Sequence, residues 1–569
     1  MRPAPELAAV EPLGVEERLW SDQHAGLNVL TGLAIGAAVA QPRAPVPTAV
    51  PGRGAPRRSG RRRWGALEHS RWLLPAVLAV QAILSLRLIW SNTAFQDEAL
   101  YLWSGHLEWS HWQYGTPIPA FSSYFSGAPV LYPPLGAYAD TVAGLAGARI
   151  LSLCFMLIAT TLLHGVTRRI FGRRPAFFAA GLFVSMGATQ FLGAFATYDA
   201  MALMLLALAT WLGVRAADCG MVGEVALIVA SAAVLALADA SKYASTLFDP
   251  VVIATATLAA WRIRGRNVAI RIIAIFGVTL FLFLFIALRF GGPSYWHGIT
   301  TTTLSRHTGN SSAFGIWYLS FAWAGAMMAL ALIGAAVVFF TWRDLPTRLL
   351  ALSLLAAPFL APAEQARIHV FTSLFKHVDY GAWFGCILGG YALAGFVRAV
   401  PAVKANAAET VSVATVVTAT VLGAVLATNH FTWGWPNSAQ YMAALKPWAA
   451  SSHGQILFGN AGVGNIPEYY SPGTVRWSHV TGEFYFAYTD PVTGKRIFQP
   501  AAAYADAIRH GYFSLISLTG DDSLGSYDKE IRQDIRRYGN RYRLVVDVPY
   551  RLAGGARGAF LVWVRTAAP

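Results

Sequence analysis

Long apolar stretches recur along the chain between about residue 72 and residue 428, and short polar segments separate them. Each stretch is close to the roughly 20 residues that one helix needs to cross the hydrocarbon layer of a membrane. The pattern predicts an α-helical polytopic membrane protein with about eleven transmembrane helices. The predicted spans lie at about 72–90, 144–166, 175–194, 200–216, 222–240, 246–261, 270–290, 315–341, 349–363, 379–397 and 409–428.

More polar sequence flanks this transmembrane region, which we place at residues 71–430. Residues 1–70 are rich in Pro, Arg and Ala, with arginines gathered just before the first span, which is typical of a disordered basic cytoplasmic tail. Residues 431–569 have the composition of a soluble domain, and their order of strand-like and helical segments predicts a small α/β fold. Its strands are predicted at 455–458, 512–518, 542–548 and 559–564, and its helices at 501–510 and 526–538.

Basic residues set the expected orientation, because loops on the cytoplasmic side of a membrane carry an excess of Lys and Arg. Starting from a cytoplasmic N-terminus in the plasma membrane, five alternate loops in succession are basic. These loops hold Arg168, Arg169, Arg173, Arg174, Arg215, Arg262, Arg264, Arg266, Arg271, Arg343, Arg348, Arg398 and Lys404. The same frame places the first loop, residues 91–143, and the C-terminal domain on the extracytoplasmic side.

Composition argues against two other classes of protein. Only 13% of the residues are charged, whereas about 25% is usual in soluble proteins. The net charge of +15 would suit a nucleic-acid partner, but the basic residues lie where a topology signal places them, so we expect no nucleic acid. The three cysteines all precede the C-terminal domain, so that domain has no disulfide framework.

The first outside loop carries the first candidate chemistry. Asp97 and Glu98 follow span one directly, and aromatic residues that include Tyr101 and Tyr132 indicate that the loop folds along the membrane interface. Adjacent carboxylates at such a place could simply cap a helix, since acids in a first turn favour the helix dipole. A second outside acid, Asp199, lies in the very short connection between spans three and four, where an ionisable group is costly and usually functional.

Cations also gather on the outside, where the positive-inside rule would exclude them. They stand between spans five and six, after span seven and in the loop before span ten. The candidate ligands for an anion are Lys242, Arg306, Arg367, Lys376 and His377. Snorkelling to lipid headgroups would explain one or two of them. A common anionic ligand at the outer leaflet explains why every longer outside loop supplies one, and a lipid phosphate is the natural candidate.

Short motifs follow one another in order between about residues 70 and 400. They are Phe95-Gln-Asp-Glu-Ala-Leu-Tyr-Leu102, Tyr132-Pro-Pro-Leu-Gly136, Ala148-Arg-Ile-Leu-Ser152, Thr197-Tyr-Asp-Ala200, Ser241-Lys-Tyr243 and Thr372-Ser-Leu-Phe-Lys-His377, with Trp383-Phe384 behind the last. In this order and on the outer face, they resemble the polytopic GT-C glycosyltransferases. The resemblance is to the family-39 branch, which includes the protein O-mannosyltransferases and the bacterial aminoarabinose transferase of lipid A.

This resemblance implies a GT-C fold, a polyprenyl-phosphate-linked sugar as donor, an extracytoplasmic active site and inversion at the anomeric carbon. By position, Asp97 matches the catalytic acid of the first loop and Asp199 matches the second acidic position. Lys242, Arg306 and Lys376 match plausible phosphate ligands. The tyrosines that we expect to line the substrate site are Tyr101, Tyr132, Tyr198 and Tyr243.

The same reaction makes physical sense from the residue types alone. A lipid phosphate is already a good leaving group, so no general acid need protonate it, and cations can stabilise the charge that it develops. The acceptor hydroxyl must lose a proton as it attacks, and one positioned carboxylate suffices as the general base. We assign that role to Asp97, with Glu98 or Asp199 orienting it or the acceptor.

Several alternatives stay open. A transporter or lipid-linked-sugar flippase would place ionisable groups near mid-membrane, whereas these groups lie at the outer boundary, with Asp239 as the main exception. Eleven spans are excessive for a receptor or structural anchor. Mannose and arabinose donors fit equally, and the acceptor could be a protein, a glycan or a glycolipid. The spacing of Asp97, Glu98, His106 and His111 is not a recognised ligand pattern, so we assign no metal and leave metal dependence and oligomeric state open.

Overall fold

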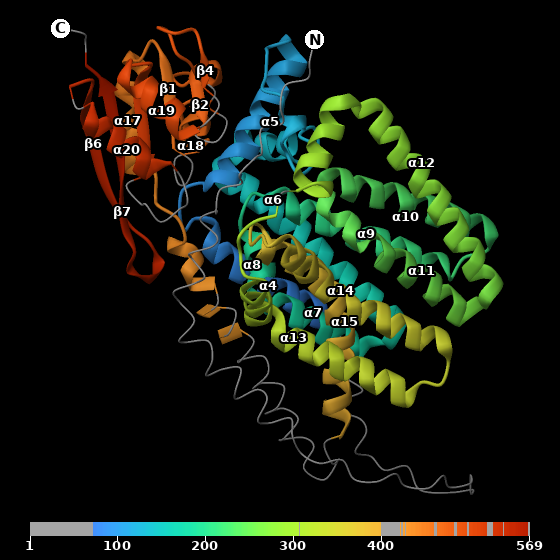
Figure 1. The fold of residues 1–569 in the computed structure, drawn as a ribbon. Coiled ribbons are helices and arrows are strands. Elements are labelled where there is room, and N and C mark those ends of the chain that lie inside the picture. Colours follow the sequence, from blue (N-terminus) through green and yellow to red (C-terminus); the bar gives the residue numbers. More distant parts are fainter. Residues whose placement is uncertain are drawn as a thin grey trace, which may run out of the picture.

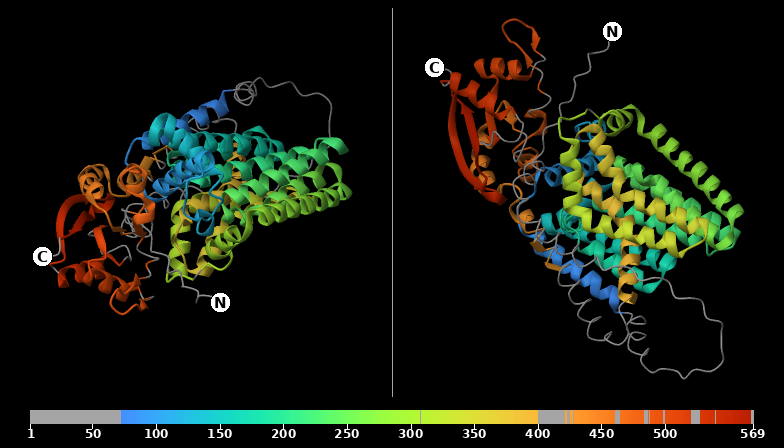
Figure 2. Two further views of the ribbon diagram at one scale, coloured as in Figure 1. Left: turned by 90° about the horizontal axis from the view of Figure 1, so that it is seen from above. Right: turned by 60° about the horizontal axis from the view of Figure 1, so that its bottom comes forward.

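A computed structural model of the chain describes the transmembrane region and most of the C-terminal domain. The described residues are 72–306, 308–399, 421–422, 425–426, 428–459, 464–482, 486, 488–497, 500–519, 527–538 and 540–566. The predicted tail at 1–70 and most of the predicted span at 409–428 lie outside them. Figures 1 and 2 show a bundle of long helices with a smaller sheet-containing domain at one end, next to helix α5.

Twelve helices between residues 73 and 399 build this bundle and its outer end. They are α4 (Leu73–Ile89), α5 (Gln96–Tyr114), α6 (Tyr132–Phe171), α7 (Arg173–Val184), α8 (Gly187–Ala194), α9 (Tyr198–Ala216), α10 (Met221–Ser241), α11 (Asp249–Arg264), α12 (Arg266–Ile299), α13 (Ala313–Thr341), α14 (Leu345–Ile368) and α15 (Leu374–Ala399). The short helices η2 (Phe121–Ser123), η3 (Tyr243–Phe248) and η4 (Thr300–Leu304) join some of them.

The chain is a membrane protein by the length and hydropathy of these helices. Seven helices in the described part can cross a membrane, or eight if the bent pair of α7 and α8 forms one span. Helix α4, with 17 residues, is shorter than these. The predicted span at 175–194 coincides with the bent pair, in which the backbone is extended at Met186 and the two helices meet at a bend of 70°.

Helix α6 joins the outside loop to the second span without a break in its ribbon. Pro133 and Pro134 occupy its first turn, where a missing N–H and a fixed φ favour helix initiation. Inside it, the backbone leaves helical geometry at Ala143 and at Gly144, whose φ of 63° suits glycine. The predicted span at 144–166 therefore begins at this kink, and residues 132–142 form a separate helical segment before it.

The C-terminal domain contains a five-stranded mixed sheet with the strand order β2-β1-β5-β7-β6. Strand β1 pairs parallel with both β2 and β5, whereas β7 pairs antiparallel with both β5 and β6. The strands are β1 (Gln455–Phe458), β2 (Val480–Gly482), β5 (Phe513–Thr519), β6 (Tyr542–Arg551) and β7 (Arg557–Arg565), with β3 (Tyr488–Thr489) and β4 (Arg496–Ile497) in a separate hairpin. The helices are α17 (Ala439–Ser451), α18 (Ile466–Tyr470), α19 (Pro500–Arg509) and α20 (Asp528–Arg537).

Both faces of this sheet are covered, as the alternation of its buried residues requires. Ile456 and Leu515 pack in the cluster that contains α17, whereas the adjacent Leu457 and Ile516 pack in the cluster that contains α19 and α20. The sequence prediction of an α/β domain is confirmed here: the four predicted strands and two predicted helices are all present, with bounds shifted by at most three residues.

Helix α18 attaches this domain to the end of the bundle where α5 begins. The backbone N–H of Ala94 donates to the Tyr470 hydroxyl at 2.9 Å, and the Tyr469 hydroxyl donates to Asp140 Oδ1 at 2.7 Å. The other oxygen of Asp140 lies 2.7 Å from His106 Nε2. Asp140 therefore joins α5, α6 and α18 at one point.

Glu468 on α18 makes the free energy of unfolding depend on pH. Burial raises its pKa from 4.5 to about 8, so the folded state holds the proton more tightly than the unfolded state. Its stabilising contribution is fully present below about pH 4.5 and is lost as the pH rises through about 8. Glu468→Gln stays neutral, so in thermal unfolding it is expected to be more stable than wild type by a few kcal/mol near pH 8.5 and equal to it near pH 4.5.

A matched control separates this effect from general charge removal. Glu530 on α20 is exposed, so Glu530→Gln is expected to leave the pH dependence of the unfolding midpoint unchanged. Parallel pH curves for wild type and Glu468→Gln would contradict the assignment.

Candidate active site

The first candidate acid stands beside one of the candidate cations. Asp97 lies in the first turn of α5 with its side chain 32% exposed, and Lys376 lies in the first turn of α15 with its side chain 1% exposed. Lys376 Nζ donates to Asp97 Oδ2 at 2.7 Å. The sequence predicted Lys376 and His377 in a loop before a span at 379–397, and this was wrong, because α15 starts at Leu374 and carries both residues.

A second acid and cation pair repeats this arrangement. Lys242 follows the last residue of α10, and its Nζ lies 3.8 Å from Asp199 Oδ1 in the first turn of α9. The same Nζ donates to Ser126 Oγ at 3.2 Å and to the Tyr198 hydroxyl at 3.4 Å. Asp199 is fully buried, and within the described residues its Oδ2 has no hydrogen-bond partner. The Tyr380 hydroxyl, from α15, donates to the backbone carbonyl of Asp199 at 3.2 Å.

Tyrosine side chains connect the two pairs. The Tyr101 and Tyr198 rings lie 4.3 Å apart between centroids. Burial first, and then the negative charges of Asp97 and Asp199, raise the pKa of Tyr101 well above its usual value. Tyr101 therefore stays a neutral phenol. Because the charges of both acids act on it and its ring contacts Tyr198, it connects the two pairs.

The other two predicted tyrosines are buried close by. Tyr132 is fully buried at the start of α6, and its hydroxyl lies 3.3 Å from Ser152 Oγ. Tyr243 follows Lys242 directly, and among the described residues its buried hydroxyl has no hydrogen-bond partner.

Three of the candidate cations converge on His377. The charges of Lys242, Arg306 and Lys376 all act on its buried imidazole, whose Nδ1 lies 3.4 Å from the Gln365 side-chain amide nitrogen. Arg367 is placed elsewhere: it ends α14, it is 66% exposed, and it pairs with Glu364 on the same helix. Three of the five predicted phosphate ligands thus act electrostatically on a fourth, His377, whereas Arg367 is paired with Glu364.

Glu98 faces away from this cluster, into a buried ion pair. Its side chain is 0% exposed and receives two hydrogen bonds from Arg149, from Nε to Oε1 at 2.8 Å and from an η nitrogen to Oε2 at 2.6 Å. The backbone N–H groups of Ala196 and Phe95 donate to the same carboxylate at 2.7 and 3.4 Å. The helix cap considered for these acids is therefore present, at Glu98.

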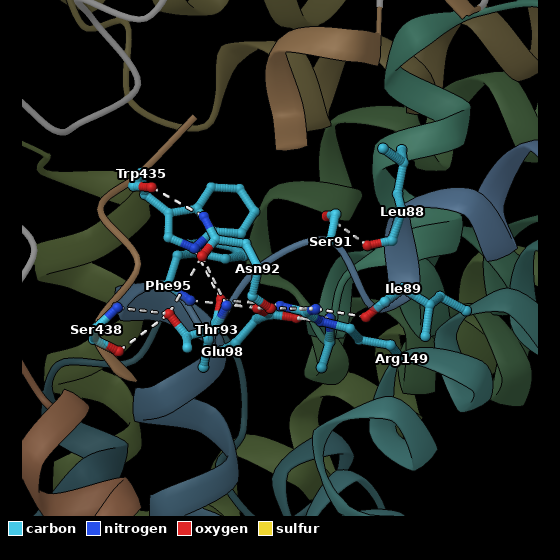
Figure 3. Close-up of polar contacts among 12 residues, drawn as sticks. Leu88, Ile89, Ser91, Asn92, Thr93, Phe95, Glu98, Arg149, Trp435 and Ser438 are labelled. Atoms are coloured by element: carbon cyan, nitrogen blue, oxygen red, sulfur yellow. Dashed lines mark hydrogen bonds and ion pairs between the residues drawn. The ribbon is translucent and has the colours of Figure 1, made fainter. Parts of the chain in front are cut away.

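Arg149 uses its remaining donors on the segment between α4 and α5. It donates to the carbonyl oxygens of Ile89, Asn92 and Thr93 at 2.7, 2.9 and 3.2 Å, as Figure 3 shows. Because Glu98 neighbours Asp97 and Arg149 holds the preceding segment, this network fixes where α5 begins. It thereby positions Asp97 toward Lys376.

The C-terminal domain reaches the same segment. Trp435 Nε1 donates to the Thr93 carbonyl at 2.8 Å, and the Ser438 backbone N–H donates to Thr93 Oγ1 at 3.0 Å (Figure 3). In return, the side-chain amide of Asn92 donates to the Trp435 carbonyl at 2.9 Å. We call Trp435 to Ser438 the anchor segment. It joins the C-terminal domain to the residues that hold Asp97.

The histidines of the first loop are engaged away from Asp97. His106 pairs with Asp140, and His111 Nδ1 lies 2.8 Å from the Thr116 carbonyl oxygen. In the described part of the chain, the group of acids and histidines spaced to share a metal ion is a different one, in the C-terminal domain. It consists of Asp490, Asp506 and His510.

Sequence reasoning did not assign a role to Arg149, Ser126 or Tyr380. Arg149 could have been found as a charged residue inside the predicted second span, where such a residue is costly. Ser126 gave no such signal, because its place depends on contacts between distant segments. A Cβ atom at Gly127 would lie 2.1 Å from the Ser241 carbonyl oxygen, so glycine lets the first loop touch the end of α10 and bring Ser126 to Lys242.

Comparisons with known proteins bear on the family and the fold. A family model described as dolichyl-phosphate-mannose-protein mannosyltransferase matches residues 141–289. No curated protein sequence matches the chain. Among solved structures, ArnT from Cupriavidus metallidurans in the apo state is similar with a TM-score of 0.52 and 15% identity, over 88% of this chain and 97% of that one. This chain has a GT-C glycosyltransferase fold.

Two further structures with the GT-C fold were determined with ligands. ArnT from Cupriavidus metallidurans bound to undecaprenyl phosphate is similar with a TM-score of 0.51 and 15% identity, over 88% of this chain and 98% of that one. The oligosaccharyltransferase AglB from Archaeoglobus fulgidus, in complex with an inhibitory peptide and a dolichol-phosphate, has a TM-score of 0.55 and 10% identity, over 88% and 74%. The family model and the fold together support a membrane glycosyltransferase.

Proposed function

We propose that this GT-C protein transfers a sugar from a polyprenyl-phosphate-linked donor to a hydroxyl of an extracytoplasmic acceptor, with inversion at the anomeric carbon. The observation that carries the proposal is a partly exposed carboxylate, Asp97, paired with the buried Lys376 of α15. A second buried pair, Lys242 with Asp199, lies beside it across the contacting rings of Tyr101 and Tyr198. Such a set can accept a proton on one side and hold a phosphate on the other.

In the proposed reaction, Asp97 is the general base. The acceptor oxygen attacks the anomeric carbon and loses its proton to the Asp97 carboxylate, while the bond from that carbon to the phosphate oxygen breaks. Lys242, Lys376, Arg306 and His377 surround the leaving phosphate. Their charges and hydrogen bonds stabilise the second negative charge that the phosphate develops, so no acid has to protonate it.

The remaining residues hold this set in place. Asp199 orients Lys242, and Glu98 orients α5 through Arg149. Tyr101, Tyr132, Tyr198 and Tyr243 line the site, and the neutral hydroxyl of Tyr101 is a hydrogen-bond donor for the sugar. We place Arg367 outside the phosphate site because Glu364 neutralises it on an exposed helix end.

The ligands of the similar structures support the proposed donor class: they are undecaprenyl phosphate in ArnT and a dolichol-phosphate in AglB. We propose that the N-terminus is cytoplasmic and that the first loop and C-terminal domain are extracytoplasmic, in the cell membrane. A flippase is less compatible with this site, because the cations and acids of the site gather at one end of the helix bundle.

Release of free polyprenyl phosphate from a labelled donor tests the function. Purified protein given a polyprenyl-phosphate sugar and a membrane-envelope extract as acceptor is expected to form it, because only transfer breaks the sugar–phosphate bond. Donor movement across a vesicle without bond cleavage would instead identify a flippase. Mass analysis of surface glycans and glycoproteins, with and without the gene, would then name the sugar and acceptor.

Lys242 gives a separate test of the phosphate site. Lys242→Met in an Asp199→Asn background removes both members of a buried pair, so no charge is left unpaired. Relative to Asp199→Asn alone, the KM for donor is expected to rise about tenfold or more, since a charge-assisted hydrogen bond to phosphate is lost. Steady-state kinetics over a donor titration measure this.

Arg367→Met is the matched control for Lys242, because Arg367 is a cation of the same outer face placed outside the site. It is expected to leave the KM for donor unchanged. An unchanged donor titration in the Lys242 variant would reject its phosphate role.

A further inference from the structure

We propose that Lys376 transfers its charge from Asp97 to the leaving phosphate in the same step in which Asp97 takes up the acceptor proton. This inference rests on the proposed function and deepens it, because it couples the general base to the leaving group through one side chain. Lys376 would then be both a partner of the base and a ligand of the phosphate.

The contact between the two residues is the first reason. Lys376 Nζ lies 2.7 Å from Asp97 Oδ2, at the distance of a charge-assisted hydrogen bond. In this pair the negative charge of the carboxylate cancels the positive charge of the lysine. Once Asp97 has taken up the proton it is neutral, and it no longer cancels the charge of Lys376. That positive charge can then act on the phosphate.

The charges of the proposed step balance across this pair. Before transfer, the phosphodiester of the donor carries one negative charge, and Lys376 and Asp97 cancel. During transfer, the acceptor O–H bond breaks and its proton goes to Asp97, the acceptor oxygen bonds to the anomeric carbon, and the carbon–oxygen bond to phosphate breaks with its electron pair on the phosphate oxygen. Afterwards Asp97 is neutral, the phosphate carries two negative charges, and the positive charge of Lys376 is no longer cancelled by Asp97.

The burial of the pair distinguishes it from a structural ion pair. In the pair of Arg149 and Glu98, both side chains are at most 1% exposed, and both make several further hydrogen bonds. In the pair of Lys376 and Asp97, the lysine is 1% exposed but the carboxylate is 32% exposed. Asp97 is therefore open to an acceptor, while Lys376 stays in a desolvated place where a change in its partner's charge has a large effect.

The surroundings of Lys376 are rich in cations, which suits an anion such as phosphate. Lys376 acts together with Lys242 and Arg306 on the imidazole of His377. These cations come from the ends of three different elements, α10, η4 and α15. In the proposal, the leaving phosphate lies among these cations and becomes the new partner of the Lys376 charge.

A double-mutant cycle on ligand binding tests the coupling. Asp97→Asn mimics the protonated acid, and its side-chain oxygen can still accept a hydrogen bond from Lys376. The full-length protein in detergent is titrated with undecaprenyl phosphate, the product-like dianion, in four forms: wild type, Asp97→Asn, Lys376→Met and the double variant. Asp97→Asn is expected to bind about tenfold more tightly than wild type, and this gain is expected to disappear when Lys376 is methionine.

Glu364→Gln controls for loss of a negative charge on the same face. Glu364 pairs with Arg367 outside the cation cluster, so this variant is expected to bind undecaprenyl phosphate as wild type does. The Asp97→Asn measurement also stands without the methionine variants, should Lys376→Met fail to accumulate.

The outcomes separate this inference from the function on which it rests. An equal gain in affinity with and without Lys376, or no gain in Asp97→Asn, would overturn the charge transfer and leave the glycosyltransferase proposal intact. A wild-type protein that does not bind undecaprenyl phosphate at all would overturn the proposed donor class, and the inference with it.

Discussion

Asp97→Asn is expected to lower kcat for sugar transfer at least about a hundredfold, because general acid–base catalysis contributes about 10²- to 10⁴-fold. The asparagine keeps the shape of the side chain and an oxygen for Lys376, but it cannot take the acceptor proton. The KM for donor is not expected to rise, since the change removes a negative charge from the neighbourhood of the phosphate. Initial rates with a polyprenyl-phosphate sugar measure both constants.

The folded state of this variant should be close to that of wild type. The asparagine oxygen keeps a hydrogen bond for the buried Lys376, but its counter-charge is lost, so the thermal unfolding midpoint is expected to fall somewhat while folded protein still accumulates in membranes. Asp97→Glu, which restores a base at a displaced position, is expected to recover part of the activity. Transfer by Asp97→Asn at a rate within a few fold of wild type would remove Asp97 from the role of base.

Arg149→Met is expected to have the largest effect on stability, a loss of about 3–5 kcal/mol, since it leaves the buried Glu98 charge without its cation. It also leaves the carbonyl oxygens of Ile89, Asn92 and Thr93 without their donor. The measurement is the thermal unfolding midpoint of the detergent-solubilised protein, together with the folded yield.

Two comparisons identify the cause of that loss. The double variant Glu98→Gln with Arg149→Met has no buried charge, so it is expected to be more stable than Arg149→Met alone. Arg367→Met breaks an exposed pair with Glu364 and is expected to leave the midpoint unchanged. If the double variant is no more stable than Arg149→Met alone, Arg149 and Glu98 are not coupled as the geometry indicates.

Much of the site could be predicted from the order of residue types along the chain. Topology placed Asp97, Asp199, Lys242 and Lys376 at one end of the helices, and residues that share an end of a bundle must lie within side-chain reach of some neighbours. Chain order alone does not determine which acid meets which lysine. Those partners depend on how the first turns of α15 and α5 meet and how the first loop touches α10, which are contacts between distant segments.

Other features could not be predicted from local pattern. The residues at 175–194 are apolar throughout, and hydropathy carries no sign of the bend at Met186. Glu98 and Asp97 are adjacent carboxylates with the same local sequence, yet one is buried against Arg149 and the other is partly exposed beside Lys376. Their different roles arise from helical rotation, which turns successive side chains of α5 by about 100°.

The anchor segment determines where the C-terminal domain could be joined to another protein in a hybrid. Trp435 and Ser438 are matched to Thr93 and Asn92 in the catalytic half. A hybrid joined before Trp435 would import a foreign segment that has to fit this loop, whereas a joint after Ser438 would keep the native fit. Any acceptor preference that the C-terminal domain carries could then be exchanged between proteins, and in evolution the anchor segment and the loop before Asp97 would change together.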